Sequence, residues 1–155
     1  ICGGFQMLGN TISDPDGIEG VAEMVPGLGL LNVDTVLAPH KVLRPVDGTL
    51  ANTQACVAGY EIHAGRTFGE GLSRPFLKLK DALDGAVSPD GRLFGCYVHG
   101  LFNAPEARAA ILAPCGITSN GIAHDIFVDQ RLDEVAAALE QHLDVPGLMQ
   151  LSGLA

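Results

Sequence analysis

The chain has few basic residues and no long apolar run. Only nine of its 155 residues are Lys or Arg, against eighteen Asp and Glu, which gives a formal net charge of −9. A protein this acidic repels phosphate backbones, so we expect no nucleic-acid partner. Spanning a bilayer takes about 20 consecutive apolar residues. No run approaches that length, and we expect no membrane anchor.

Cysteine pairs and phosphate-binding glycine loops are also missing. The four cysteines (Cys2, Cys56, Cys96 and Cys115) include no Cys-x-x-Cys pair, so we expect neither a metal nor a thioredoxin-like site. Apolar residues make up 47% of the chain, enough for a core that needs no disulfides, and we expect a reducing, cytoplasmic setting. A Gly-x-x-x-x-Gly-Lys-[Ser/Thr] loop for nucleotide phosphates is absent.

The remaining pattern predicts a mixed α/β fold. Strand-like runs alternate with turn-rich segments in the middle of the chain (runs at 28–37, 56–63, 76–79 and 93–99; turns at 13–20 and 88–91). Two helices are expected at 104–112 and 125–143. In the second helix, apolar residues recur at spacings of three and four (Val128, Leu132, Val135, Leu139 and Leu143). Together these elements predict one α/β domain over residues 1–155.

The first nine residues, ICGGFQMLG, place Cys2 directly before two glycines. A nucleophile among small residues at the start of a helix is typical of a nucleophile elbow, the sharp turn that exposes a reactive side chain. The helix N-terminus favours the thiolate and offers N–H groups to an oxyanion. An inert, buried cysteine beside a glycine turn fits the same residues equally well. The presence of a histidine that can act as its base would distinguish a reactive Cys2 from an inert one.

Two of the five histidines lie where a catalytic base is expected. His63 and His99 each end a predicted strand and run into glycine, which places the imidazole at the exposed end of a strand, where α/β folds collect their sites. The other three have simpler interpretations. His40 is expected in a turn, and His124 and His142 as solvent-facing or capping residues. The residues alone leave His63 and His99 as alternatives.

Three segments in this order, ICGGFQMLG, GYEIHAGRT and CYVHGLF, resemble the glutamine amidotransferase domain of the cobyric acid synthase family, which amidates corrin carboxylates. The segments GIEG and GLGLLNVDT and the terminal helix also fit. The resemblance implies a flavodoxin-like class I glutamine amidotransferase domain, N-terminally truncated at the nucleophile elbow. It implies no cofactor in this domain. It also implies that a separate synthetase domain, using ATP and Mg²⁺, lies outside these residues.

The resemblance also assigns roles to individual residues. Cys2 corresponds to the nucleophile, and His99 corresponds to the catalytic histidine of the Tyr-x-His-Gly-Leu-Phe motif, while His63 is structural or lines the pocket. Gly3 would donate its backbone N–H to the oxyanion. Many class I amidotransferases carry a glutamate two residues after the histidine, but Leu101 stands there in this chain. The triad is therefore a dyad, or another segment or another chain completes it.

The implied partners are glutamine and, through the synthetase domain, a corrin. Lys41 or Arg44 would meet the carboxylate of glutamine, although each also fits an ordinary solvated charge.

Three alternative functions remain open at this point. One is an amidotransferase subunit that amidates a cell-wall lipid intermediate, which shares the elbow and the Tyr-x-His-Gly motif. The others are a cobyrinic acid diamide synthase and a non-catalytic, truncated domain kept for binding or as an interface.

Overall fold

The computed structural model describes residues 1–153 and confirms a mixed α/β fold. The helices are α1 (Gly3–Met7), α2 (Pro105–Leu112), α3 (His124–His142) and α4 (Val145–Ser152), with 3-10 turns at Glu70–Ser73 and Ala113–Cys115. The strands are β1 (Thr11–Asp14), β2 (Glu23–Pro26), β3 (Asp34–Leu50), β4 (Cys56–Phe68), β5 (Leu77–Leu79), β6 (Leu83–Asp84), β7 (Ala86–Val87), β8 (Phe94–Gly95) and β9 (Val98–His99).

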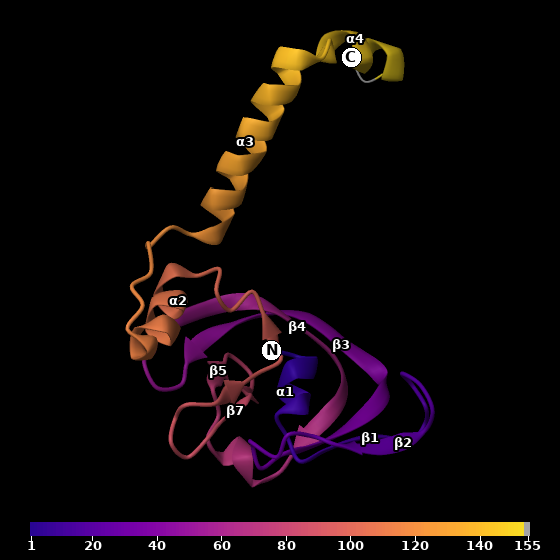
Figure 1. Ribbon diagram of the computed structural model, residues 1–155, viewed down its shortest axis with the longest axis vertical. Helices are drawn as coiled ribbons and strands as arrows, with labels where there is room; N and C mark the ends of the chain where they lie inside the picture. The colour runs from indigo at the N-terminus through magenta and orange to yellow at the C-terminus, as the bar shows by residue number, and fades with distance from the viewer. Residues whose placement is uncertain (154–155) are drawn as a thin grey trace.

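The main sheet is built around the long strands β3 and β4, which curve past α1 (Figure 1). Its strand order is β2-β1-β3-β4-β9, with β5 and then β6 added beside β3. The strands β7 and β8 form a separate two-stranded ribbon. Among the described strands only β1 and β3 pair in parallel, and every other pair is antiparallel.

The largest departure from the sequence prediction concerns β3. A strand was predicted at 28–37 with His40 in a turn, and this is wrong at both ends. Residues 28–33 lie outside any strand, with bends at 29–32, whereas the strand continues through Pro39 and His40 to Leu50. Proline has no N–H to donate to a ladder. The structure accommodates it because the pairing with β4 is interrupted between Val36 and Lys41, where no such bond is required.

The other predicted elements are present with shifted ends. The run at 56–63 extends to Phe68 as β4, and the run at 76–79 becomes β5. The run at 93–99 is split into β8 and β9, because the backbone N–H of Tyr97 donates to the Asp84 carboxylate instead of to a neighbouring strand. Both predicted helices are confirmed to within one residue at each end, and His124 and His142 lie exposed on α3.

The core consists of two buried clusters, and the first of them holds α1 in place. In the first, Phe5 of α1 is 1% exposed and packs edge-to-face on Tyr97, with ring centroids 5.3 Å apart. Edge-to-face packing of this kind adds about 0.5–1.5 kcal/mol to simple area burial. The second cluster lies under β9 and α2 and includes Val98 and Leu101. Leu101 is therefore a core residue, and α1 is fixed next to the strand that carries His99.

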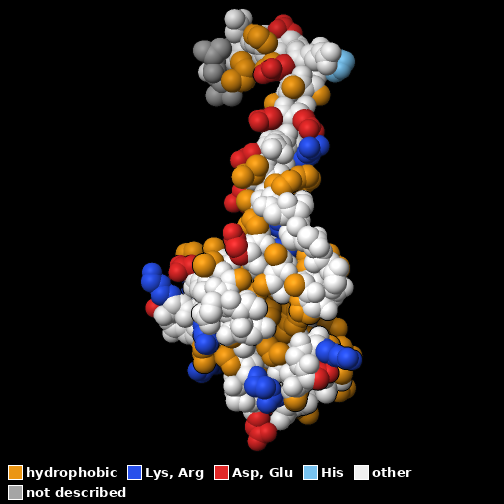
Figure 2. All heavy atoms as spheres, turned by 90° about the vertical axis from the view of Figure 1, so that its left-hand side faces the viewer, with side chains coloured by type: hydrophobic (Ala, Val, Ile, Leu, Met, Phe, Trp, Pro, Cys, Tyr) orange, Lys and Arg blue, Asp and Glu red, His pale blue; other side chains and the backbone are white. Residues whose placement is uncertain are grey.

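Helix α3 projects away from the sheet, with α4 at its far end (Figure 1). Every residue of α3 is exposed, including the predicted apolar stripe, of which Leu132 is 60% and Leu139 49% exposed. Figure 2 shows hydrophobic and acidic side chains side by side along this projection. Among the described residues, no helix is both long enough and apolar enough to cross a bilayer.

Gly59 of β4 lies directly against the backbone of His99 in β9. A Cβ at this position would overlap the carbonyl oxygen of His99. We expect Gly59→Ala to separate the two strands and to destabilise the fold by about 1–3 kcal/mol, the usual cost of overpacking. Urea unfolding of the variant measures this loss. Gly20→Ala is the matched control, because a Cβ there meets nothing within 4 Å. Equal unfolding midpoints for the two variants would contradict this account.

Candidate active site

Cys2 occupies the tight turn that begins α1. Its backbone is at φ 54° and ψ −121°, a left-handed conformation that is rare and costly for a residue with a side chain. Two hydrogen bonds hold it there. The N–H of Cys2 donates to the carbonyl of Cys96 (2.8 Å), and the Cys2 thiol donates to the carbonyl of Ile62 (3.2 Å). Residue 2 thus has the strained backbone that a nucleophile elbow requires.

His99 is positioned by strand pairing and by an aromatic stack. It ends β9, where it pairs with Tyr60 of β4, and the two rings stack almost in parallel with centroids 5.1 Å apart. The Nε2 atom of His99 is buried and has no hydrogen-bond partner among the described residues. Buried polar atoms without a partner are rare in folded proteins and often mark a catalytic role. This nitrogen is available to a thiol or a ligand.

A cavity of about 240 Å³ brings the candidate residues together. It is lined by Cys2, Gly3, Gln6, Glu19, Leu37, Lys41, Ile62, His63, Ala64 and His99. Four of the five site residues named from the sequence therefore share one cavity, namely Cys2, Gly3, Lys41 and His99. Their order along the chain did not reveal this proximity. It arises because β4 and β9 pair beside the start of α1.

Arg44, the fifth candidate, is not part of this cavity. Its Nε donates to a carboxylate oxygen of Glu61 at 2.7 Å, and its side chain lines a separate surface hollow with Asp47 and Lys80. Of the two cations proposed to meet glutamine, the structure brings only Lys41 to the cavity that contains Cys2.

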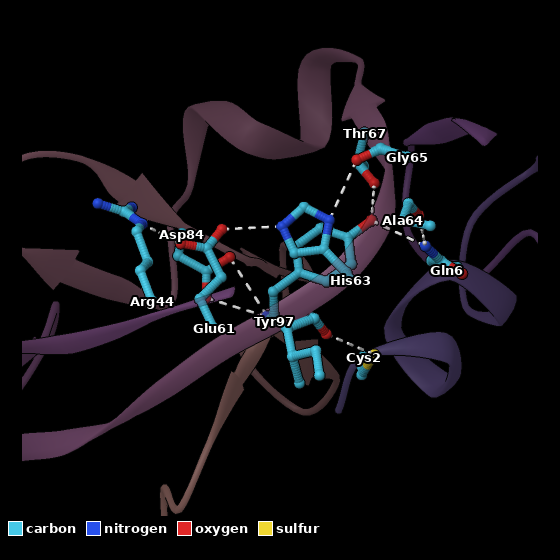
Figure 3. Close-up of polar contacts among 11 residues, drawn as sticks. Cys2, Gln6, Arg44, Glu61, His63, Ala64, Gly65, Thr67, Asp84 and Tyr97 are labelled. Carbon is cyan, nitrogen blue, oxygen red and sulfur yellow. Dashed lines mark hydrogen bonds and ion pairs between the residues drawn. The ribbon is translucent and has the colours of Figure 1, made fainter. Parts of the chain in front are cut away.

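His63 is buried and both of its ring nitrogens are engaged (Figure 3). Its Nε2 lies 2.8 Å from Glu61 Oε1 and its Nδ1 lies 3.1 Å from the carbonyl oxygen of Gly65. The ring also stacks on Tyr97, with centroids 3.7 Å apart. A general base needs a free nitrogen within reach of the substrate. Among the described residues, His63 has partners at both ring nitrogens, whereas His99 Nε2 has none.

Burial and hydrogen bonding shift the pKa values of Glu61, Asp84 and Cys96. Burial raises the pKa of Glu61, but hydrogen bonds from His63 and Arg44 outweigh it, and the net result is a lowered pKa. Burial raises the pKa of Asp84, partly offset by the backbone N–H of Tyr97. Burial also raises the pKa of the Cys96 thiol to about 12, which keeps it protonated at neutral pH.

Two polar residues of the cavity, Gln6 and Glu19, were not singled out from the sequence. The amide of Gln6 donates to the carbonyl of Ala64 (3.2 Å) and to the hydroxyl of Tyr97 (3.3 Å), which ties α1 to the cavity wall. Glu19 belongs to the GIEG segment, whose fit to the resembled family was the only available signal. Within residues 1–153, no group of three or more His, Cys, Asp or Glu side chains is arranged to hold a metal ion.

Comparison with known proteins agrees with the motifs. The model of the CobB/CobQ-like glutamine amidotransferase domain matches residues 1–107. The chain is 53% identical over 155 residues to a protein named cobyric acid synthase from Caulobacter sp. (strain K31), and 50% identical over 152 residues to one of that name from Rhodobacter capsulatus. These alignments cover 99% and 98% of the chain but 32% of each relative.

The chain thus spans about a third of the length of these curated relatives. A third relative with the same name, from Hyphomonas neptunium, is 50% identical over 154 residues. The family match ends within α2 and includes every residue that lines the cavity around Cys2. The resemblance found from the three motifs is confirmed, and the chain belongs to the family of CobB/CobQ-like glutamine amidotransferase domains.

Proposed function

We propose that the chain catalyses the glutaminase half-reaction of a cobyric acid synthase, supplying ammonia for the ATP-dependent amidation of corrin carboxylates in cobalamin biosynthesis. The observation that carries this proposal is the shared cavity of Cys2, in its strained turn, and His99, with its unpartnered Nε2. The identity of about 50% to proteins named cobyric acid synthase supports the corrin as final acceptor.

The first step forms a bond between Cys2 and glutamine. In the structure the thiol donates to the carbonyl of Ile62, and it must leave this acceptor to give its proton to His99 Nε2. The thiolate sulfur then attacks the side-chain carboxamide carbon, whose oxygen becomes an oxyanion. Gly3 is the first residue of α1, so its N–H has no acceptor within the helix and is available to stabilise that charge.

The second step breaks the C–N bond and releases ammonia. The protonated His99 returns its proton to the departing nitrogen, which leaves a γ-glutamyl thioester on Cys2. Neutral His99 then takes a proton from a water molecule, and the resulting hydroxide attacks the thioester carbon. Collapse of this second tetrahedral intermediate breaks the C–S bond, releases glutamate and restores the thiol. One histidine thus serves both halves of the reaction.

Lys41 is the cation that we assign to the α-carboxylate of glutamine, since it lines the cavity and Arg44 does not. The ammonia then reaches a corrin carboxylate that ATP and Mg²⁺ activate elsewhere in the longer protein. Residues 1–155 contain no Gly-x-x-x-x-Gly-Lys-[Ser/Thr] loop that would bind the nucleotide phosphates. In this proposal ATP activates the acceptor, and the residues of this chain supply the nitrogen.

Replacing the nucleophile tests the proposal directly. We expect Cys2→Ala to lower the rate of ammonia release from glutamine by at least about 1,000-fold, because none of the other cysteines lines the cavity where the thioester would form. The rate is measured in the chain and in a version extended to the length of the relatives. Cys115→Ala, which alters an exposed cysteine, is the control and keeps full activity. Undiminished glutaminase activity of Cys2→Ala would refute the assignment.

Replacing the base gives an independent test. We expect His99→Asn to reduce kcat for glutamine hydrolysis by about 100- to 10,000-fold, the usual contribution of a general acid–base residue. The melting temperature should change little, because His99 is only partly buried. His124→Asn, which alters an exposed histidine of α3, serves as the control. If His99→Asn and His124→Asn show the same kcat, the proton transfer must involve another residue.

A further inference from the structure

Two residues of opposite charge line the cavity that contains Cys2. They are Glu19 and Lys41, and both are exposed. The ion pairs of the described residues are Arg44–Glu61, His63–Glu61 and Arg131–Glu134, so neither Glu19 nor Lys41 belongs to one. Two opposite charges that line one cavity, not joined to each other within this part of the chain, suit a ligand that carries both charges.

The position of Glu19 is fixed by a buried carboxylate. Asp14, which is 8% exposed, accepts hydrogen bonds from the backbone N–H groups of Ile18 (2.8 Å) and Glu19 (2.9 Å). Asp14 ends β1, and β1 pairs in parallel with the beginning of β3. The segment that carries Glu19 is thus tied to the central sheet, so this residue has a defined place beside the cavity.

Lys41 reaches the cavity for a different reason. It is the first residue of β3 to pair again with β4 after the interruption that begins at Val36, and its partner in the register is Ala64. Ala64 lines the same cavity, as does Leu37 within the interruption. The irregular part of β3 therefore forms one wall of the cavity and places a positive charge there. The acidic and basic residues come from separate segments that meet at the substrate position.

We propose that Glu19 binds the α-ammonium group of glutamine while Lys41 binds its α-carboxylate, so that the cavity selects a free α-amino acid. This inference rests on the proposed glutaminase function. Glutamine carries its two charged groups at one end and its reactive carboxamide at the other. With the charged end between Glu19 and Lys41, the carboxamide is directed toward Cys2 and His99. No bond to the α-carbon is made or broken, and Glu19 acts in recognition only.

Binding measurements in a Cys2→Ala background test this without requiring turnover. Two ligands are titrated by calorimetry: glutamine, and glutaramate, which is glutamine without its α-amino group. We expect Glu19→Gln to weaken the binding of glutamine by about 10- to 100-fold, the contribution of a hydrogen bond to a charged group. The same substitution should leave the affinity for glutaramate unchanged. Lys41→Gln should lower the affinity for both ligands equally, because both carry the carboxylate.

Asp16→Asn is the matched control, since it removes a negative charge from the same segment at a residue that does not line the cavity. Equal losses for glutamine and glutaramate in Glu19→Gln, or no loss for either, would overturn the inference. The same holds if the Cys2→Ala chain binds neither ligand. Failure of the proposed function is recognised separately, by glutaminase activity that survives Cys2→Ala. If Cys2→Ala abolishes glutaminase activity but Glu19→Gln changes the affinities for glutamine and glutaramate equally, the role of Glu19 in recognition is rejected and the proposed function stands.

Discussion

The pairing of β4 with β9, next to the first turn of α1, is the constraint on which the site depends. Through Ile62, β4 offers the carbonyl that accepts the Cys2 thiol, and through Tyr60 it pairs and stacks with His99. The strained backbone of Cys2 persists because its N–H is also bonded to Cys96, just before β9. Cys2 and His99 are thus held by one pair of strands, although they lie 97 positions apart in the sequence.

The part of β4 that contains Tyr60 and Ile62 is stabilised by a second set of contacts. Alternate side chains of a strand point to opposite faces, so Glu61 and His63 share one face and Tyr60 lies on the other. On the first face, Arg44 and His63 both bond to the Glu61 carboxylate, and His63 also reaches the carbonyl of Gly65. Partnered in this way, a buried imidazole and carboxylate avoid the cost of unpaired burial. These contacts around His63 stabilise the part of β4 to which Cys2 and His99 are bonded.

Local patterns in the sequence predicted the parts of the structure that depend on neighbouring residues. Gly3 and Gly4 beside Cys2 indicated a tight turn, and the spacing of apolar residues indicated α3. Features that depend on distant pairing were missed. The continuation of β3 through Pro39 requires a break in the ladder with β4, and the place of Glu19 requires its bond to Asp14. Lys41 and Arg44 could not be separated by charge, since only the strand register decides which one faces the cavity.

The cavity around Cys2 and the projecting helix α3 are formed by separate parts of the chain. The cavity residues extend from Cys2 to His99, inside the part of the chain that matches the family, whereas α3 begins seventeen residues after that part ends, counting from residue 107 to His124. An isolated helix of fewer than about 15 residues is marginal in water, and α3, with 19, has no buried residue along its apolar stripe. Its helicity rests on local terms, such as the three alanines at 136–138 and the Arg131–Glu134 pair. The geometry of Cys2 and His99 therefore depends on the sheet and the clusters beneath it, and not on α3.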